Sequence, residues 1–289
     1  MFKRLFNNPG RFPCQAIFFV ITNSKTGREG VMSWEKELSV ARQVALETGA
    51  LLKSFLGRVT QIAHKGETDL VTEADLQSER LILESMGRHF PGDTFLTEET
   101  GQHGHGSKRV WLIDPLDGTV NFAHELPFFA VSIALQVQGE TMVGVVYNPC
   151  TQELFETASG FGAFLNQKPI AVSKTDKLID SLLATGFPYT MHQDPRDVMK
   201  RLNNLVVRGR AVRRIGSAAM DLCYVAAGRF AGYWEQDLKP WDTAAGALLV
   251  EEAGGRVTDF EGNRFTPFLK TVAASNSLIH DDLLAALRL

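Results

Sequence analysis

The spacing of apolar residues predicts two helices near the start of the chain. The first apolar stripe consists of Leu38, Ala41, Ala45, Leu52 and Phe55. Ser33 precedes this stripe at the position of a capping residue, so the pattern predicts a helix over residues 33–55. Leu76, Leu83 and Phe90 predict the buried face of a second helix, which ends at the proline that follows.

Short apolar runs predict strands that alternate with further helices. In the first half these runs lie at 95–97, 110–113, 128–137, 141–147, 154–157 and 162–165. In the second half, predicted strands at 182–185, 211–215, 230–235 and 256–259 are interleaved with predicted helices at 197–207, 217–227 and 243–253. Gly139 and Glu140 separate two of the runs and indicate a hairpin. This order predicts the α/β class, with helices and mixed sheets in alternating layers (α+β layered). We also expect two lobes, divided near residue 185.

The first 31 residues do not follow this pattern. They hold a few basic residues and a short apolar patch at 16–21, far below the ~20 apolar residues of a membrane span. No clear cleavage site follows the patch, so a secretory signal is not indicated. We predict a flexible extension, or a gene start placed too early with Met32 as the natural first residue, ahead of one domain at 32–289.

Composition excludes several classes of protein. With 44% hydrophobic residues and a formal net charge of −3, the chain has the balance of a globular protein, not the basic surface of a general nucleic-acid binder. Cys14, Cys150 and Cys223 are too few and too widely spaced for a disulfide framework, which favours a reducing, cytoplasmic location. His103 and His105 lie in a glycine-rich loop without partner cysteines, and we interpret them as solvated.

The main chemical signal is a pair of carboxylates after the apolar run 110–113. Asp114, Asp117 and Thr119 follow this run, in a turn where Gly118 tolerates unusual backbone angles. A polar turn after a strand is one interpretation, since Asp and Gly are common there. A binding site for hard cations, which prefer oxygen ligands, is the other.

Acidic residues at similar places elsewhere favour the cation site. Asp75, Glu98 and Asp242 also stand at or beside the ends of predicted elements, although helix capping alone would explain Asp242. A two-metal centre draws several carboxylates from separate elements and positions a water for attack on phosphorus. Asp114 and Asp117 lack the Asp-x-Asp spacing of a phosphoaspartate nucleophile, and no Gly-x-Ser-x-Gly elbow, phosphate loop or dinucleotide fingerprint is present. Hydrolysis by a metal-activated water is therefore favoured.

These motifs resemble those of a known family. Asp114-Pro-Leu-Asp-Gly-Thr-Val-Asn-Phe122 is similar to the first signature of the inositol monophosphatase family, and Trp241-Asp-Thr-Ala-Ala-Gly246 to the second. Asp69-Leu-Val-Thr-Glu-Ala-Asp75 and Thr97-Glu-Glu99 also fit, in the right order. The resemblance extends from about Met32 to the C-terminus. The segments that begin at Phe122 and Gly216 resemble the bacterial inositol-1-monophosphatase branch more than the bisphosphate nucleotidase branch.

The resemblance implies an αβαβα sandwich of the sugar-phosphatase type and a site with two to three Mg²⁺ ions. The implied ligands of one ion are Glu98, Asp114 and the carbonyl oxygen of Leu116, and those of the second are Asp114, Asp117 and Asp242. The implied catalytic residues are Glu98, Thr119 and Asp75, with Thr119 and Asp75 positioning the water. The implied substrate-binding residues are Glu98, Leu116, Asp117, Gly118, Thr119, Gly216, Ser217, Ala218, Glu235 and Asp242. Lys65 aligns near a third metal region only with a gap of one residue.

The activity implied is hydrolysis of myo-inositol 1-phosphate and related polyol monophosphates (EC 3.1.3.25), sensitive to lithium and carried out by a homodimer away from membranes. Sibling phosphatases act on fructose 1,6-bisphosphate, nucleotide 3′(2′),5′-bisphosphates or histidinol phosphate, and they stay open as alternatives. Some bacterial relatives associate with RNA polymerase and transcript processing, for which the basic cluster Arg208, Arg210, Arg213 and Arg214 is the relevant local feature. Because the net charge is negative, we favour a solvated or dimer-facing strand for this cluster.

Overall fold

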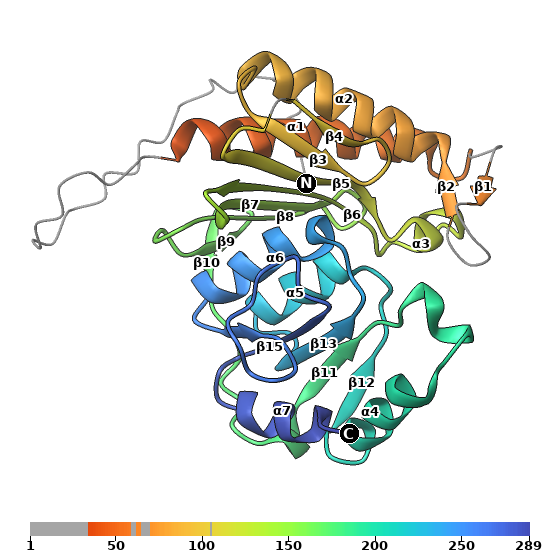
Figure 1. Ribbon diagram of the computed structural model, residues 1–289, viewed down its shortest axis with the longest axis vertical. Coiled ribbons are helices and arrows are strands. Elements are labelled where there is room, and N and C mark those ends of the chain that lie inside the picture. Colours follow the sequence, from red (N-terminus) through yellow and green to blue (C-terminus); the bar gives the residue numbers. More distant parts are fainter. Residues whose placement is uncertain (1–33, 59–61, 65–69, 105) are drawn as a thin grey trace, which may run out of the picture. The chain divides into compact units, whose positions relative to one another are not determined.

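The computed structural model describes residues 34–58, 62–64, 70–104 and 106–289 (Figure 1). The extension 1–31, Ser33, Cys14, Lys65, Asp69 and His105 lie outside these residues, and the expectations for them stay predictions. From Trp34 to Leu289 the chain forms one compact unit. Among the described helices, none has the length and apolar character needed to cross a membrane.

An eight-stranded mixed sheet forms the larger β layer. Its order is β10-β9-β8-β7-β6-β5-β3-β4, with β3 parallel to β5 and the other pairs antiparallel. The strands are β3 (Thr94–Thr97), β4 (Gly101–His103), β5 (Arg109–Asp117), β6 (Ala130–Val137), β7 (Glu140–Asn148), β8 (Glu153–Ala158), β9 (Ala163–Leu165) and β10 (Lys168–Ile170). The predicted hairpin is confirmed in the pairing of β6 with β7. A separate antiparallel pair joins β1 (Ile62–His64) and β2 (Leu70–Thr72).

A five-stranded mixed sheet forms the second β layer. Its order is β12-β11-β13-β15-β14. The strands are β11 (Leu182–Thr185), β12 (Ala211–Arg213), β13 (Gly232–Gln236), β14 (Arg256–Thr258) and β15 (Thr271–Ser275). The predicted lobe boundary near residue 185 coincides with the end of β11 and stays a prediction.

Helices cover both faces of each sheet. They are α1 (Glu35–Phe55), α2 (Glu73–His89), α3 (Thr119–Ala123), α4 (Arg196–Val206), α5 (Ala218–Ala226), α6 (Pro240–Glu252) and α7 (His280–Leu287), with 3₁₀ turns at Leu178–Asp180 and Tyr189–His192. Side chains alternate across β5: Trp111 and Ile113 pack in the cluster of α1 and α2, whereas Leu112 packs in the cluster of α5 and α6. The five-stranded sheet is covered by α5 and α6 on one face and by α4 and α7 on the other. The expected αβαβα layering is confirmed (Figure 1).

The helices α5 and α6 pack closely against each other, and α6 packs closely against the large sheet. A Cβ added at Gly246 would lie 2.5 Å from the Cβ of Leu222, and one added at Gly144 on β7 would lie 3.0 Å from the Cα of Ala245. Every residue of α5 is buried, and so are eight consecutive residues of α6, because both helices lie between two sheets. This explains why their apolar residues run continuously rather than in stripes.

Several expected elements differ from the observed ones. Leu76 is exposed, because α2 instead buries Ala74, Ser78, Ile82 and Met86. The predicted loop 101–106 contains β4, which is held at the sheet edge by β3. The strand predicted to end at Ile113 continues to Asp117. The strand β15 and the helix α7 were not predicted: β15 has alanine at two of its five positions, and α7 has no side-chain cap.

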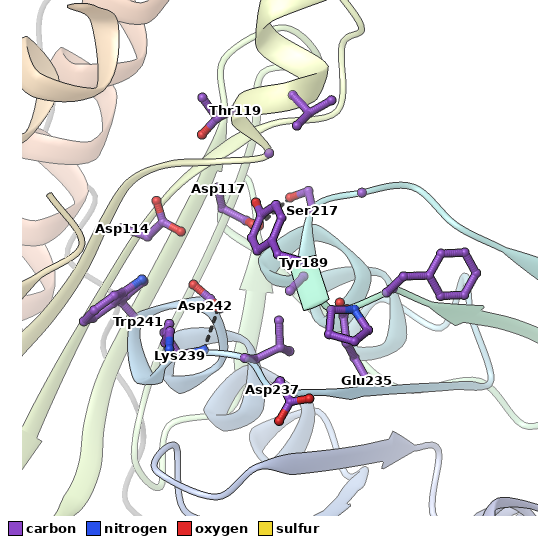
Figure 2. A pocket seen from close by; sticks show the side chains of 18 of the residues that line it. Asp114, Asp117, Thr119, Tyr189, Ser217, Glu235, Asp237, Lys239, Trp241 and Asp242 are labelled. Atoms are coloured by element: carbon purple, nitrogen blue, oxygen red, sulfur yellow. Dashed lines mark hydrogen bonds between the residues drawn. The ribbon is translucent and has the colours of Figure 1, made fainter. Parts of the chain in front are cut away.

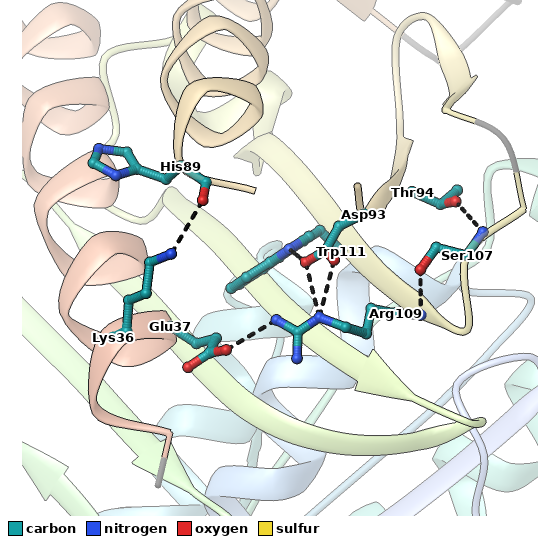
Figure 3. Close-up of polar contacts among 8 residues, drawn as sticks. All are labelled: Lys36, Glu37, His89, Asp93, Thr94, Ser107, Arg109 and Trp111. Atoms are coloured by element: carbon teal, nitrogen blue, oxygen red, sulfur yellow. Dashed lines mark hydrogen bonds and ion pairs between the residues drawn. The ribbon is translucent and has the colours of Figure 1, made fainter. Parts of the chain in front are cut away.

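An ion-pair network joins α1 to the start of the large sheet (Figure 3). Arg109 donates to Asp93 at 2.9 Å and to Glu37 at 2.9 Å, and the indole of Trp111 donates to Asp93 at 2.9 Å. The guanidinium is only partly exposed, so its carboxylate partners offset the cost of burying the charge. The network fixes one end of β5, and the polar residues described below lie at its other end.

His280 predicts a loss of stability in acid. Its ring is fully buried between Thr258 and Ser275, at 2.9 and 2.8 Å, and burial lowers its pKa to about 4. Between that pH and ~6.5 the unfolded chain binds a proton that the folded chain excludes, so acidification lowers the free energy of unfolding by up to about 3 kcal/mol.

The comparison with His280→Gln isolates this effect, because a glutamine amide offers both a donor and an acceptor to the two hydroxyls and does not titrate. Urea unfolding between pH 7.5 and 5 is the measurement. The wild-type protein is expected to lose stability relative to the variant as the pH falls. A difference between the two proteins that does not change with pH would contradict the prediction.

Candidate active site

A pocket of about 370 Å³ lies between the two sheets, where β5 ends and α5 and α6 begin. Its lining includes Glu98, Asp114, Leu116, Asp117, Gly118, Thr119, Gly186, Phe187, Tyr189, Arg214, Gly216, Ser217, Ala218, Glu235, Asp237, Lys239, Trp241 and Asp242. Figure 2 shows Asp114, Asp117 and Asp242 near one another, with Glu235 farther along the pocket. The structure thus brings together every expected site residue except Asp75, which contacts the pocket through Thr119.

A bulge at the end of β5 directs the two aspartates into the pocket. The pairing of β5 with β6 shifts register between Asp114 and Asp117, where Pro115 has no amide hydrogen to give to the ladder. Gly118 follows with φ 94°, and a Cβ there would lie 2.9 Å from the carbonyl oxygen of Phe128. Glycine is therefore required at position 118. Its left-handed backbone conformation lets α3 begin at the next residue, Thr119.

Thr119 is tied to Asp75 from a different part of the chain. Its hydroxyl lies 3.1 Å from Asp75 Oδ1 and 3.1 Å from the carbonyl oxygen of Leu116. The other oxygen of Asp75 accepts from the amide and the hydroxyl of Thr72, at 2.8 and 2.5 Å, in a capping box at the start of α2. Burial raises the pKa of Asp75, while these hydrogen bonds act in the opposite direction. Thr119 is thus held by a carboxylate that is itself fixed.

Asp117 links the bulge to the start of α5. Its Oδ2 accepts from the Ser217 hydroxyl at 2.5 Å and from the Ala219 amide at 2.8 Å. Asn121 strengthens this link, since its amide group donates to the carbonyl oxygens of Phe128 and Ile215 at 2.6 and 2.9 Å. Burial raises the pKa of Asp117 to about 6 despite the two donors.

Asp114 and Asp242 complete the acidic end of the pocket. Asp114 accepts from the amide of Leu116 at 2.9 Å, and Asp242 accepts from the amide of Lys239 at 2.7 Å at the start of α6. Burial, and then the neighbouring charges of Glu98, Asp117 and Asp242, raise the pKa of Asp114 well above its usual value. Burial and the charge of Asp117 do the same to the pKa of Asp242. Nearby positive charge would relieve this repulsion.

Glu79 fixes the turn that carries Glu98. The buried Glu79 carboxylate on α2 accepts from the amides of Glu99 and Thr100, at 2.8 and 3.0 Å, and from the Thr100 hydroxyl at 2.5 Å. Sequence reasoning missed this residue, because Glu79 shares a helix with many other charged residues. Its burial, the only signal of its role, is not visible in the sequence.

The side chains of the described residues do not form a ready-made metal centre. In the ranges that the structure describes, no group of three or more His, Cys, Asp or Glu side chains is arranged to hold a metal ion. Asp114, Asp117 and Asp242 line one end of the same pocket. Their chemistry nevertheless fits a hard divalent cation, because they are oxygen donors whose negative charges repel one another.

The opposite end of the pocket carries Glu235 and Arg214. Glu235 is buried, and burial raises its pKa to about 7, while the Tyr233 hydroxyl and the charge of Arg214 lower it. The Arg214 guanidinium lies over the Phe187 ring, 5.8 Å from its centroid. Arg214 was expected on a solvated or dimer-facing strand with its neighbours, yet it lines the pocket. Arg214 is exposed, as a solvated residue would be, but its expected place on the strand was wrong, because the chain leaves β12 after Arg213 and turns toward Gly216.

Five α and β layers thus enclose a pocket with buried acids at the end of a bulged strand and a glycine at a close backbone approach. A model of the inositol monophosphatase family matches residues 33–289. The chain belongs to this family, as the motifs predicted, and it is an enzyme of that phosphatase class.

Individual relatives carry two kinds of name. The chain is 46% identical to an inositol-1-monophosphatase of Synechocystis over 259 residues, which are 86% of this chain and 88% of the relative. It is 43% identical to the Nus factor SuhB of Salmonella typhimurium over 254 residues, 87% and 95% of the two chains. Its fold is similar to the crystal structure of the extragenic suppressor protein suhB from Bartonella henselae, with a TM-score of 0.83, 42% identity, and coverage of 87% and 98%.

Proposed function

We propose that this enzyme is a magnesium-dependent phosphomonoesterase that hydrolyses myo-inositol 1-phosphate and related polyol monophosphates. The observation that carries the proposal is the division of one pocket into two ends. Asp114, Asp117 and Asp242 crowd one end, and Glu235 presents a buried acceptor at the other. The first end suits cations and a phosphate group, and the second suits the hydroxyls of an alcohol.

Magnesium fits the donor set at the acidic end. Glu98, Asp114 and the Leu116 carbonyl would hold one ion, and Asp114, Asp117 and Asp242 a second. When bound, such ions offset the charge of the phosphate and lower the pKa of a coordinated water. The carboxylates repel one another without a cation, so binding would be favoured by relief of that repulsion.

The residues around Gly118 would position the reacting groups. The amides of Gly118 and Thr119 follow the bulge and would donate to phosphate oxygens. The Thr119 hydroxyl, held against Asp75, would accept a hydrogen bond from the attacking water and orient it toward phosphorus. As the water attacks, Thr119 would accept one of its protons and pass its own hydroxyl proton to Asp75. The Thr119 hydroxyl would need little movement, because Asp75 already holds it.

The alcohol end favours a neutral polyol. Glu235 and Asp117 would accept hydrogen bonds from leaving-group hydroxyls, while Gly216, Ser217 and Ala218 form the wall behind them. A second phosphate beside Glu235 would be repelled, although Arg214 in the same pocket offers a counter-charge. Bisphosphates of fructose or nucleosides, and histidinol phosphate, are therefore the alternatives to test.

Phosphate release from a panel of esters tests the proposal. The panel comprises inositol 1-phosphate, glycerol 2-phosphate, fructose 1,6-bisphosphate, a nucleoside 3′,5′-bisphosphate and histidinol phosphate, each with magnesium, with chelator and with added lithium. Turnover that requires magnesium, is fastest on inositol 1-phosphate and is inhibited by lithium is the expected result. Preference for another ester would change the assigned substrate but keep the mechanism. No turnover of any ester with magnesium bound would overturn the proposal.

A regulatory role in transcription is the second candidate, favoured by the relative named Nus factor SuhB. Arg208, Arg210 and Arg213 are exposed beside or on β12, an edge strand, and Arg210 pairs with Asp180 at 2.8 Å. Binding to RNA polymerase that weakens with salt, and with neutralised arginines, would support this role. The homodimer and the cytoplasmic location stay predictions, which light scattering and cell fractionation would check.

A further inference from the structure

The buried carboxylate of Glu235 has two close neighbours. The Tyr233 hydroxyl donates to Oε2 at 2.5 Å, and both residues project from the same face of β13. Gly186 also lies against the carboxylate, so that any Cβ there would overlap it. Tyr233 is fully buried, so its hydroxyl does not reach the solvent and would not contact a ligand directly.

One oxygen of Glu235 stays available for a ligand. Among the described residues, no hydrogen bond is assigned to Oε1, although Glu235 lines the pocket. The hydrogen bond from Tyr233 to Oε2 orients the carboxylate, and Oε1 keeps both of its acceptor positions for a ligand. A single fixed acceptor recognises a hydroxyl at one position, whereas a mobile carboxylate would accept from several.

The backbone around this pair is also fixed. β11 and β13 run parallel, with Thr185 opposite Trp234, and the Thr185 hydroxyl donates to the Trp234 carbonyl oxygen at 2.8 Å. Gly186, which lies against the Glu235 carboxylate, follows Thr185 directly. The pairing of β11 with β13 therefore fixes Gly186 relative to Glu235. The hydroxyl of Tyr233 is thus the part of this support that a substitution can remove while the backbone pairing is kept.

We propose that Tyr233 is a positioning residue that makes the enzyme select leaving groups with a hydroxyl at the Glu235 carboxylate. This inference rests on the proposed function and deepens it. Removing the Tyr233 hydroxyl leaves the carboxylate without its donor, so it turns or binds water. A leaving group that uses Glu235 then binds less well, whereas one without hydroxyls is unaffected.

Tyr233→Phe tests the inference, because it removes only the hydroxyl. The two substrates are inositol 1-phosphate, a polyol ester, and p-nitrophenyl phosphate, whose leaving group has no hydroxyl. We expect KM for inositol 1-phosphate to rise about tenfold with little change in kcat, since hydrogen bonds to charged groups are among the stronger ones. The kinetic constants for p-nitrophenyl phosphate are expected to stay within about twofold.

Two further variants separate positioning from structural damage. Tyr224→Phe is the matched control, because Tyr224 is also buried and its hydroxyl donates to Glu153, which does not line the pocket. It should leave the ratio of kcat/KM between the two substrates unchanged. In a Glu235→Gln background, Tyr233→Phe should have no further effect on this ratio, because both changes act through the same group.

The outcomes distinguish the inference from the proposed function. Wild-type turnover of inositol 1-phosphate with an unchanged ratio in Tyr233→Phe would overturn the inference alone. An equal loss on both substrates, or an additive loss in the Glu235→Gln background, would also overturn it, because it would show a general structural effect. No wild-type turnover of inositol 1-phosphate would overturn the proposed function, and the inference with it.

Discussion

Asp114→Asn is expected to lower kcat/KM for inositol 1-phosphate at least a thousandfold, that is by about 4 kcal/mol, while the fold survives. Asp114 is the only residue expected to contact both metal ions, and an amide would remove the charge that holds them. The fold should persist because asparagine is isosteric and can still accept from the Leu116 amide. Relief of repulsion from Glu98 and Asp117 should even raise the melting temperature without metal.

The measurement is kcat/KM with saturating magnesium, together with thermal unfolding in chelator. Asp282→Asn, on the exposed face of α7, is the matched control and should change neither value. Activity of Asp114→Asn near that of the wild type would refute the assignment of the acidic end as the metal site. A collapse of stability would show that the charge of Asp114 is needed for folding.

Thr119→Val is expected to lower kcat by about a hundredfold to a thousandfold with little change in KM. Valine keeps the shape of threonine and removes only the hydroxyl, which lies 3.1 Å from Asp75 and is proposed to orient the attacking water. Thr119 is buried at the start of α3, so a loss of stability is a second possible effect of the substitution.

Thr119→Ser provides the control for this prediction. Serine keeps the hydroxyl and should retain activity within about tenfold. Steady-state kinetics of the two variants, with circular dichroism to check folding, make the comparison. Equal activity of valine and serine variants would show that the hydroxyl takes no part in the reaction, and Asp75 would then have only its capping role.

The acidic end of the pocket could be predicted because its information is local. Asp114, Asp117 and Thr119 are close in sequence, and their spacing resembles a family signature that the family match confirms. The bulge that turns them toward the pocket was not predicted, since the pattern of apolar residues ends at Ile113 while the backbone pairing continues to Asp117. The roles proposed for these residues stay predictions, although the structure places them in one pocket.

The surroundings of residues that pack against distant parts of the chain could not be predicted from the sequence. Arg214 was grouped with its sequence neighbours, but it lines the pocket with Phe187 and Glu235, which belong to other elements. Leu76 has helical spacing yet is exposed, because α2 buries a different face. Periodicity predicts that a helix has a buried side, and only the packing of α1 and the sheet decides which side it is.

The close packing of α6 makes the width of the active site depend on residues outside it. Asp242 stands in the first turn of α6, and Gly246, one turn later, lies against Leu222 with no room for a side chain. Gly144 gives the same clearance to Ala245 from the large sheet. Because neither glycine has a side chain, α6 can lie close to α5 and to the large sheet. This close packing fixes the position of Asp242 and therefore the width of the pocket. A larger residue at either glycine would push α6 away from its neighbours and so shift Asp242, although neither glycine lines the pocket.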